Sequence, residues 1–215
     1  MIRVLVVDDH QLVRMGISRL LADVKGIEII GQAESGEDAI DMVRDLSPDV
    51  VLMDVKMPGI GGLEATRRSL RIDPELKIIA VSVYDDEPFP SRLMSAGAVG
   101  YLTKGTNLDE MIRAIKKVHA GQRYISSDIA QQLALKPFSN ETGSPFDMLS
   151  GREMQITLMV INNQKVKEIS AALSLSPKTV NSYRYRIFEK VNVKGDVELT
   201  KLAIKHGVID SEAVA

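Results

Sequence analysis

The residues most able to do chemistry are three aspartates that stand at the ends of short apolar runs. Asp8 and Asp9 follow the run Ile2–Val7, and Asp54 follows the run Val50–Met53. Carboxylates that lie close together repel one another unless a hard cation sits between them. An open set of oxygen ligands suits Mg²⁺, which keeps several of its waters in such a site. We therefore expect a Mg²⁺ site that can orient a phosphoryl group for transfer.

Two further polar side chains follow the later apolar runs of this part of the chain. Ser82 offers a hydroxyl, and Lys104 offers a compact positive charge able to hold a phosphoryl oxygen. In a parallel sheet the carboxyl ends of the strands share one edge, where open α/β sheets bind their ligands. Single aspartates after strands are commonly helix caps or turn formers, and Asp8 alone would be explained as a cap. The set of three acids, a hydroxyl and a lysine is much harder to attribute to capping.

The elements that must position these side chains are short apolar strands alternating with amphipathic helices. Runs such as VLVV, DVVLM and IIAVSV are continuous, as expected of strands covered on both faces in a parallel sheet. Ser35 with Asp38, and Asn107 with Glu110, have the three-residue spacing of a helix cap. The pattern predicts a five-stranded parallel α/β domain, (βα)5, over residues 1–120. Its strands are expected at Ile2–Val7, Glu28–Gly31, Val50–Met53, Lys77–Val83 and Gly100–Leu102.

The rest of the chain has a different pattern. Residues 121–147 hold a short predicted helix, Ser127–Leu135, and then KPFSNETGSPFD, in which proline and glycine break every periodicity, so we interpret them as a linker. Residues 148–210 are predicted to form an all-helical domain, followed by a tail at 211–215. Its four helices are expected at Arg152–Ile161, Val166–Leu173, Pro177–Val191 and Val197–His206.

Composition and charge separate the two parts and exclude several classes of protein. Residues 1–147 carry 17 basic and 22 acidic side chains, a net charge of −5, whereas residues 148–210 carry 10 and 6, a net charge of +4. A positive excess on a small domain favours binding to a polyanion. The absence of cysteine excludes disulfides and thiolate metal sites. The apolar N-terminal run is too short for a membrane span or a signal peptide, so we expect a cytoplasmic protein that makes no membrane contact.

Residues 165–191 have the spacing of a helix-turn-helix motif. An amphipathic helix is followed by a turn at Leu173–Ser176 and a second helix, with Ser176 as its N-cap and Pro177 at its first position. Apolar residues at helical spacing would pack the two helices together and leave the polar residues toward solvent or a DNA groove. A helical bundle with a solvated basic face is the alternative interpretation.

Residues 1–120 resemble the response-regulator receiver domain, which has a flavodoxin-like fold. The motifs that carry this resemblance are VDDH at 7–10, MDVKMPGIGGLE at 53–64, VSV at 81–83 and GYLTKG at 100–105. The resemblance implies that a sensor kinase phosphorylates the domain. For Tyr101, ordinary packing in the sheet is an alternative to a switching role. The implied roles are phosphorylation of Asp54, Mg²⁺ binding by Asp8, Asp9, Asp54 and Lys56, and phosphoryl contact or switching by Ser82, Lys104 and Tyr101.

Residues 148–210 resemble the LuxR-type output domain of the NarL/FixJ response regulators, in LSGRE at 149–153, KEIS at 167–170 and LSPKTVNSYRYRIFEK at 175–190. Over its full length the chain is similar to the GacA/UvrY/SirA/VarA group of global activators. This similarity implies a hybrid sensor histidine kinase, RNA polymerase, and a homodimer on a palindromic site in double-stranded DNA, with small regulatory RNA genes among the targets. The implied base readers are Asn181, Ser182 and Tyr185, and the implied contacts to phosphates or groove margins are Lys178, Thr179, Arg184 and Arg186. The last helix would supply dimer contacts through Leu199, Leu202 and Ala203, or would equally be a core helix.

The expected function is transcription activation, in which phosphorylation frees a masked output domain to dimerise on DNA. An enzyme that used Asp54 as a covalent nucleophile would also need a substrate pocket and a second acid or base, and the pattern offers no such set. A DNA-binding protein whose receiver only dimerises is a further alternative. The complete set of Asp54, Ser82 and Lys104 argues against it.

Overall fold

The chain folds into two compact units, Met1–Ser139 and Asn140–Ala215. The structure, a computed structural model, describes residues 1–83, 89–135 and 144–209. Residues 136–143 of the predicted linker and the predicted tail at 211–215 lie outside the described residues. Within the described ranges no helix combines the length and the hydrophobicity that a membrane crossing requires.

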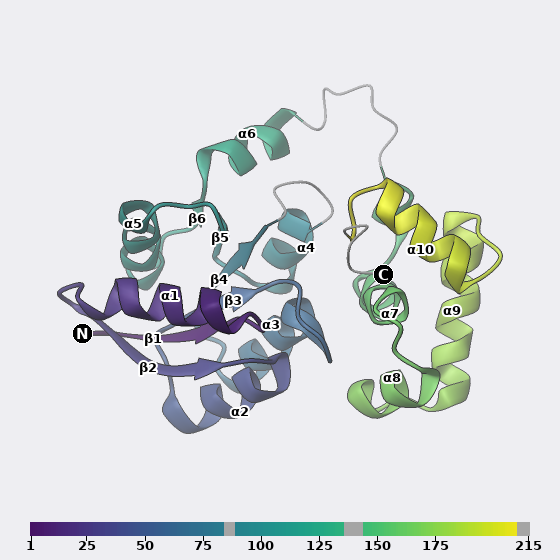
Figure 1. Cartoon of the computed structure of the whole chain (residues 1–215), viewed down its shortest axis with the longest axis horizontal. Helices are drawn as coiled ribbons and strands as arrows, with labels where there is room; N and C mark the ends of the chain where they lie inside the picture. Colours follow the sequence, from purple (N-terminus) through teal and green to yellow (C-terminus); the bar gives the residue numbers. More distant parts are fainter. Residues whose placement is uncertain (84–88, 136–143, 210–215) are drawn as a thin grey trace. The chain divides into compact units, whose positions relative to one another are not determined.

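The first unit is built on a six-stranded parallel sheet in the order β2-β1-β3-β4-β5-β6 (Figure 1). The parallel α/β class that the continuous apolar runs predict is confirmed. The predicted number of strands is corrected by one, because Tyr124 and Ile125 pair with Gly100 and Tyr101 beyond β5. A strand of two residues is too short to show a hydrophobic period, so the sequence carries no signal for it. The strands are β1 (Ile2–Val7), β2 (Ile27–Ala33), β3 (Val50–Asp54), β4 (Lys77–Ser82), β5 (Gly100–Thr103) and β6 (Tyr124–Ile125).

Helices form a layer on each face of this sheet. Helix α1 contacts α5, whereas α2 contacts α3 and α3 contacts α4. Both predicted caps are confirmed: the Ser35 hydroxyl accepts from the Asp38 amide at 3.1 Å, and the Asn107 side-chain oxygen accepts from the Glu110 amide at 2.9 Å. These bonds start α2 and α5. The helices are α1 (Gln11–Ala22), α2 (Gly36–Leu46), α3 (Gly61–Ile72), α4 (Phe89–Ala96), α5 (Leu108–His119) and α6 (Ser127–Leu135).

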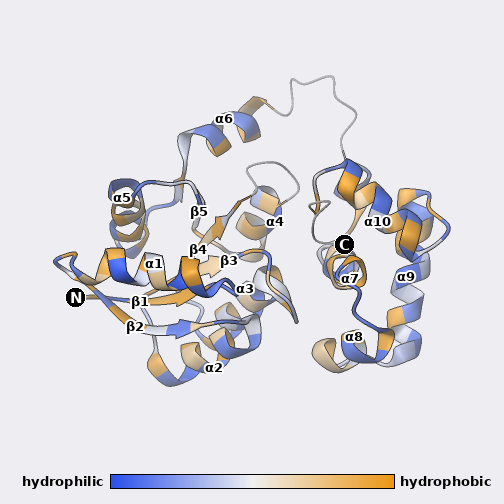
Figure 2. Cartoon of the chain, viewed as in Figure 1, coloured by the Kyte–Doolittle hydropathy of each residue, from blue (hydrophilic) through white to orange (hydrophobic). Residues whose placement is uncertain are grey.

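Hydrophobic packing on both faces fixes the strands in place. On the face covered by α1 and α5, Val4 and Val6 of β1 and Leu52 of β3 share one buried cluster with Leu21 and Ile115. The intervening residues of each strand point to the opposite face, because side chains alternate along a strand. Figure 2 shows the resulting concentration of hydrophobic residues along β1, β3 and β4. The carboxyl ends of these strands are therefore held side by side at one edge.

The described residues of the second unit, 144–209, are all-helical in their regular structure, and the four predicted α-helices are present. A short 3₁₀ helix, η2, precedes them, and α7 begins with a capping box in which Ser150 and Glu153 exchange hydrogen bonds of 3.3 and 2.7 Å. Helix α7 is the most buried of the set and contacts both α9 and α10, while α8 contacts α9. The elements are η2 (Pro145–Met148), α7 (Gly151–Ile161), α8 (Val166–Leu173), α9 (Pro177–Val191) and α10 (Asp196–Lys205).

Candidate functional site

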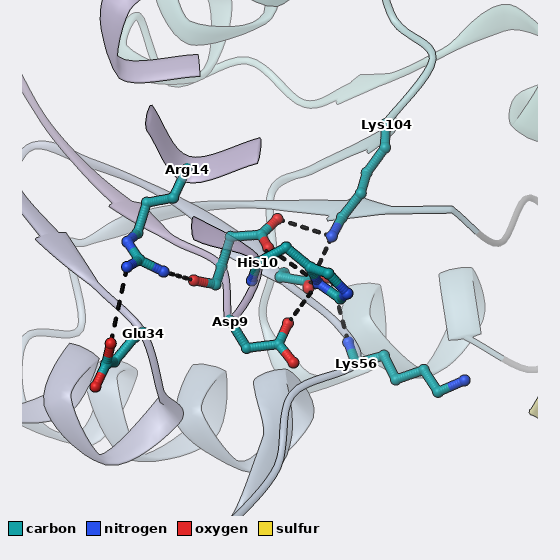
Figure 3. Close-up of polar contacts among 8 residues, drawn as sticks. Asp9, His10, Arg14, Glu34, Lys56 and Lys104 are labelled. Atoms are coloured by element: carbon teal, nitrogen blue, oxygen red, sulfur yellow. Dashed lines mark hydrogen bonds and ion pairs between the residues drawn. The ribbon is translucent and has the colours of Figure 1, made fainter. Parts of the chain in front are cut away.

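The carboxyl ends of β1 and β3 bring acidic side chains to the lysine that follows β5 (Figure 3). Asp54 ends β3, and Asp8 follows the last residue of β1, the strand that pairs with β3. The Lys104 ammonium lies 2.7 Å from Asp8 Oδ2 and 2.9 Å from Asp54 Oδ2. Asp8 and Asp54 are only 2% and 3% exposed, so both ion pairs are largely shielded from water. Because the strand order reverses at β1, the cluster lies at the switch point where such sheets bind ligands.

Burial sets the protonation of this cluster. The pKa of Asp54 is raised from 3.8 to about 6, and the largest cause is the loss of water on burial. The Lys104 ammonium and the Lys56 amide oppose this rise, whereas the charge of Asp8 adds to it. Burial alone would lower the pKa of Lys104, but the carboxylates of Asp54 and Asp8 raise it above its ordinary value. At neutral pH the site therefore holds a charged ammonium beside an Asp54 that is mostly a carboxylate.

The same side chains can supply ligands to a divalent cation. Asp8, Asp9, His10 and Asp54 each offer one ligand atom, and these atoms all lie within 4.8 Å of one another. Three of the four are carboxylate oxygens, which hard cations prefer. The Asp9 side chain is 26% exposed, so the cluster is open to solvent on that side. Three carboxylates against one ammonium leave an excess of negative charge, so this donor set fits Mg²⁺.

The remaining predicted receiver residues lie around this cluster. Ser82 ends β4, is 1% exposed, and follows Val81, the residue that pairs with Asp54. The Lys56 amide donates to Asp54 Oδ1 at 3.3 Å, which places the Lys56 backbone at the site. Tyr101 lies in β5 and is fully enclosed. Their roles in metal binding and switching remain predictions.

The contacts of two residues at the site, Arg14 and His10, are not predicted by any sequence pattern. Arg14 of α1 donates to the backbone carbonyl of Asp8 at 2.5 Å, and its other terminal nitrogen lies 3.8 Å from a Glu34 carboxylate oxygen (Figure 3). His10 Nδ1 lies 2.9 Å from Asp9 Oδ1. The target of Arg14 is a main-chain atom, which leaves no trace in residue types. The VDDH motif contains His10 but does not indicate that its ring turns back toward the acids.

In the second unit, α8 and α9 form the predicted helix-turn-helix. Ser174 closes α8 in a left-handed conformation, and the Ser176 hydroxyl accepts from the Thr179 amide at 3.1 Å to start α9. Val180, Ile187 and Val191 bury one side of α9, and the opposite side carries most of the predicted DNA contacts. Lys178, Tyr185 and Arg186 are exposed, and Tyr185 is 67% exposed, which is unusual for a large aromatic side chain. Thr179, Asn181, Ser182 and Arg184 are half-buried.

The predicted dimer residues on α10 do not share one environment. Leu199 is 1% exposed and Ala203 is fully buried, so both belong to the core of their own unit. Leu202 is half-buried. The core-helix interpretation therefore accounts for Leu199 and Ala203, and a contact between two chains through α10 remains a prediction.

Comparison with known proteins assigns both units. Residues 4–116 match the response regulator receiver domain, and residues 147–203 match the bacterial regulatory proteins of the luxR family. The chain is 62% identical to the response regulator GacA of Pseudomonas viridiflava over 214 residues, covering 99% of this chain and 100% of that protein. It is 57% identical to the response regulator UvrY of Escherichia coli strain K12, covering 100% of this chain and 99% of that one.

A solved structure of Salmonella enterica RcsB, bound to the promoter rprA in the presence of BeF3-, shares the fold. Its TM-score is 0.72 at 22% identity, over 94% of this chain and 98% of that one. The chain belongs to the two-component response regulators that join a receiver domain to a LuxR-type helix-turn-helix DNA-binding domain, a family of transcription regulators rather than enzymes.

Proposed function

We propose that a sensor histidine kinase phosphorylates Asp54 and that this modification promotes dimeric, sequence-specific DNA binding and transcription activation. The observation that carries the proposal is the Lys104 ammonium, held between Asp8 and Asp54 at the sheet edge. A phosphoryl group on Asp54 brings oxygens that a point charge at this distance can hold. The same carboxylates fit the Mg²⁺ that phosphoryl transfer requires.

In the transfer step, an Asp54 oxygen attacks the phosphorus of a phosphohistidine, the new O–P bond forms, and the N–P bond to the imidazole breaks. Asp8 and Asp9 would hold a Mg²⁺ ion, which would supply charge neutralisation to the transferring oxygens. Lys104 contributes its ammonium to the same oxygens. Because the Asp54 carboxylate is already buried, little water has to be removed before the attack.

The switch follows from the change in charge at Asp54. A phosphoryl group draws Lys104 and the Ser82 hydroxyl toward its oxygens, which alters the ends of β4 and β5. Tyr101, enclosed in β5, then changes position and biases a two-state surface that includes α4. The phosphorylated chain dimerises and places one α9 in the major groove of each half of a palindromic site.

By similarity to the group that includes GacA and UvrY, the partner kinase is a hybrid sensor kinase. RNA polymerase is recruited at the bound promoter, and the targets include small regulatory RNA genes. This activity takes place in the cytoplasm. The exposed side chains of α9, led by Lys178, Tyr185 and Arg186, supply the DNA contacts.

The test is DNA binding by the full chain with and without acetyl phosphate and Mg²⁺ at one fixed salt concentration, because salt alone changes such affinities strongly. The duplex is one that the phosphodonor-treated wild type selects from a random pool. Asp54→Ala removes the proposed phosphoacceptor. Asp45→Ala is the matched control, because Asp45 is an exposed aspartate on α2 and its loss changes the net charge equally.

We expect acetyl phosphate to raise the affinity several-fold for wild type and for Asp45→Ala, and to leave Asp54→Ala unchanged. Phosphodonor-independent binding of equal strength in all three chains would contradict the proposed coupling. It would identify a DNA-binding protein whose receiver unit serves another purpose.

A further inference from the structure

Helix α9 carries an arginine whose charge is used inside its own unit. Arg184 Nη2 donates to Asp196 Oδ2 at 2.5 Å, and Nη1 donates to Asn181 Oδ1 at 3.1 Å. The guanidinium carbon also lies 5.7 Å from the centroid of the Phe188 ring. These contacts leave the Arg184 side chain 23% exposed. The guanidinium is therefore fixed between α9 and Asp196, the first residue of α10.

This arrangement decides which end of the Asn181 amide is available to another molecule. A guanidinium has donors and no acceptor, so the Asn181 atom that faces it must be the oxygen and not the amide nitrogen. The two hydrogens on Nδ2 are then left for an outside partner. Asn181 lies three residues after Lys178 and four before Tyr185, so its side chain belongs to the same helical face as these two exposed residues. That face is the one proposed to enter the DNA groove.

Given the proposed DNA-binding function, we infer that the chain of contacts from Asp196 through Arg184 makes Asn181 a reader of guanine in preference to adenine. An asparagine that reads adenine uses both ends of its amide, since it donates to N7 and accepts from the N6 amino group. The Arg184 bond uses one of the two lone pairs of Oδ1 and draws electron density toward the guanidinium, so this oxygen is a weaker acceptor for the N6 amino group of adenine. Guanine presents two acceptors, N7 and O6, in the major groove, and the free Nδ2 hydrogens match them. Arg184 and Asp196 are positioning residues that need not touch DNA.

A direct contact between Arg184 and a DNA phosphate is the competing role, and it predicts a different effect when the side chain is removed. A side chain that binds phosphate weakens binding to all sequences alike when it is removed, and lowers the salt dependence of binding by about one unit of slope. A positioning residue changes the preference at one base pair and leaves the salt slope unchanged.

The experiment selects DNA from a random duplex pool with the full chain, in the presence of acetyl phosphate and Mg²⁺, and sequences the bound fraction. Asn181→Ala first identifies the position that Asn181 reads, as the one whose preference it abolishes. Asp196→Ala and Arg184→Met then remove the two positioning side chains, and methionine preserves apolar contact with Phe188. Glu198→Ala is the matched control, because Glu198 is an exposed acid in the same first turn of α10. Circular dichroism and thermal melting confirm that each variant is folded.

In the wild type and in Glu198→Ala we expect guanine over adenine at that position by about 10-fold. In Asp196→Ala and Arg184→Met we expect this ratio to fall below about 3-fold, with the other positions and the salt slope unchanged. Adenine at the Asn181 position in the wild type, or an unchanged guanine preference in both variants, would overturn the inference alone. A salt slope lower by about one in Arg184→Met would also overturn it. A wild type that selects no sequence would overturn the proposed function, and this inference with it.

Discussion

Replacing Asp54 by asparagine should make the metal-free receiver unit more stable, although it removes the proposed phosphoacceptor. Burial raises the pKa of Asp54 from 3.8 to about 6, so the folded unit pays for keeping this carboxylate ionised. One pH unit corresponds to about 1.4 kcal/mol, which gives a cost of about 3 kcal/mol at pH 7.5. Asparagine has similar size and no charge, and Lys104 retains its ion pair with Asp8 at 2.7 Å. A gain of that size raises the melting temperature of the unit by roughly 10 °C.

The pH dependence of this gain has a definite sign. Between pH 3.8 and about 6 the folded unit holds a proton on Asp54 that the unfolded chain has lost. The stability of the wild type therefore falls as pH rises through this window, whereas that of Asp54→Asn does not. The advantage of the variant should be complete above the window and absent below pH 3.8.

Scanning calorimetry of the full chain in EDTA measures this difference. Adding Mg²⁺ to the wild type identifies the melting transition of the receiver unit. Its melting temperature is the one that rises, because a ligand stabilises only the unit that binds it. Asp45→Asn, at an exposed position on α2, controls for the loss of one negative charge. If Asp54→Asn melts at or below the wild-type temperature at pH 7.5, burial does not destabilise the Asp54 carboxylate.

The remaining predictions concern one charge at the site, one buried acid and two glycines. Lys104→Met should slow phosphorylation of Asp54 by acetyl phosphate on the order of 100-fold, read by mass spectrometry, because a positioned positive charge is lost. Burial alone would raise the pKa of Glu153, but hydrogen bonds with Lys190 and Ser150 lower it below its ordinary value. Glu153→Gln should therefore destabilise the chain by about 1–3 kcal/mol above pH 4.5. Urea titrations should show the difference in stability between wild type and variant becoming smaller at lower pH. A Cβ on Gly62 would lie 2.0 Å from the Asp54 carbonyl oxygen, so Gly62→Ala should lower the free energy of unfolding by more than about 3 kcal/mol. Nothing lies within 4 Å of a Cβ on Gly16 of α1, so Gly16→Ala should raise the free energy of unfolding by up to about 1 kcal/mol. Equal melting temperatures for the two variants would contradict both predictions.

The strands and the acidic cluster were predictable because each depends on a regular feature. A strand that is buried on both faces must be apolar throughout, so β1, β3 and β4 stand out as continuous runs. Once those strands are parallel, Asp8 and Asp54 must meet at one edge, whatever the details of packing. The Lys104 contact follows from the same geometry, since β5 ends at that edge too.

Contacts that cross between elements at particular angles were not predictable. Arg14 reaches a backbone carbonyl, and Arg184 reaches Asp196, which is 12 residues away along the chain. Either arginine would have been an ordinary surface charge if its helix were turned by a fraction of a turn. From its position in α9, the sequence pattern predicts Arg184 to be a DNA contact. Only the packing of α10 shows that its guanidinium pairs with Asp196.

The short β6 has a consequence for the mobility of the strand that ends before Lys104. Strand β5 pairs with β4 as far as Thr103, but its pairing with β6 includes only Gly100 and Tyr101. The last two residues of β5 are therefore held by a ladder on one side. Local opening of such an end breaks few backbone hydrogen bonds and costs far less than unfolding the sheet. Fluctuations can thus carry Lys104 toward or away from the acids while the rest of the unit stays folded, and faster amide hydrogen exchange at Leu102 and Thr103 than at the centre of β4 would report them.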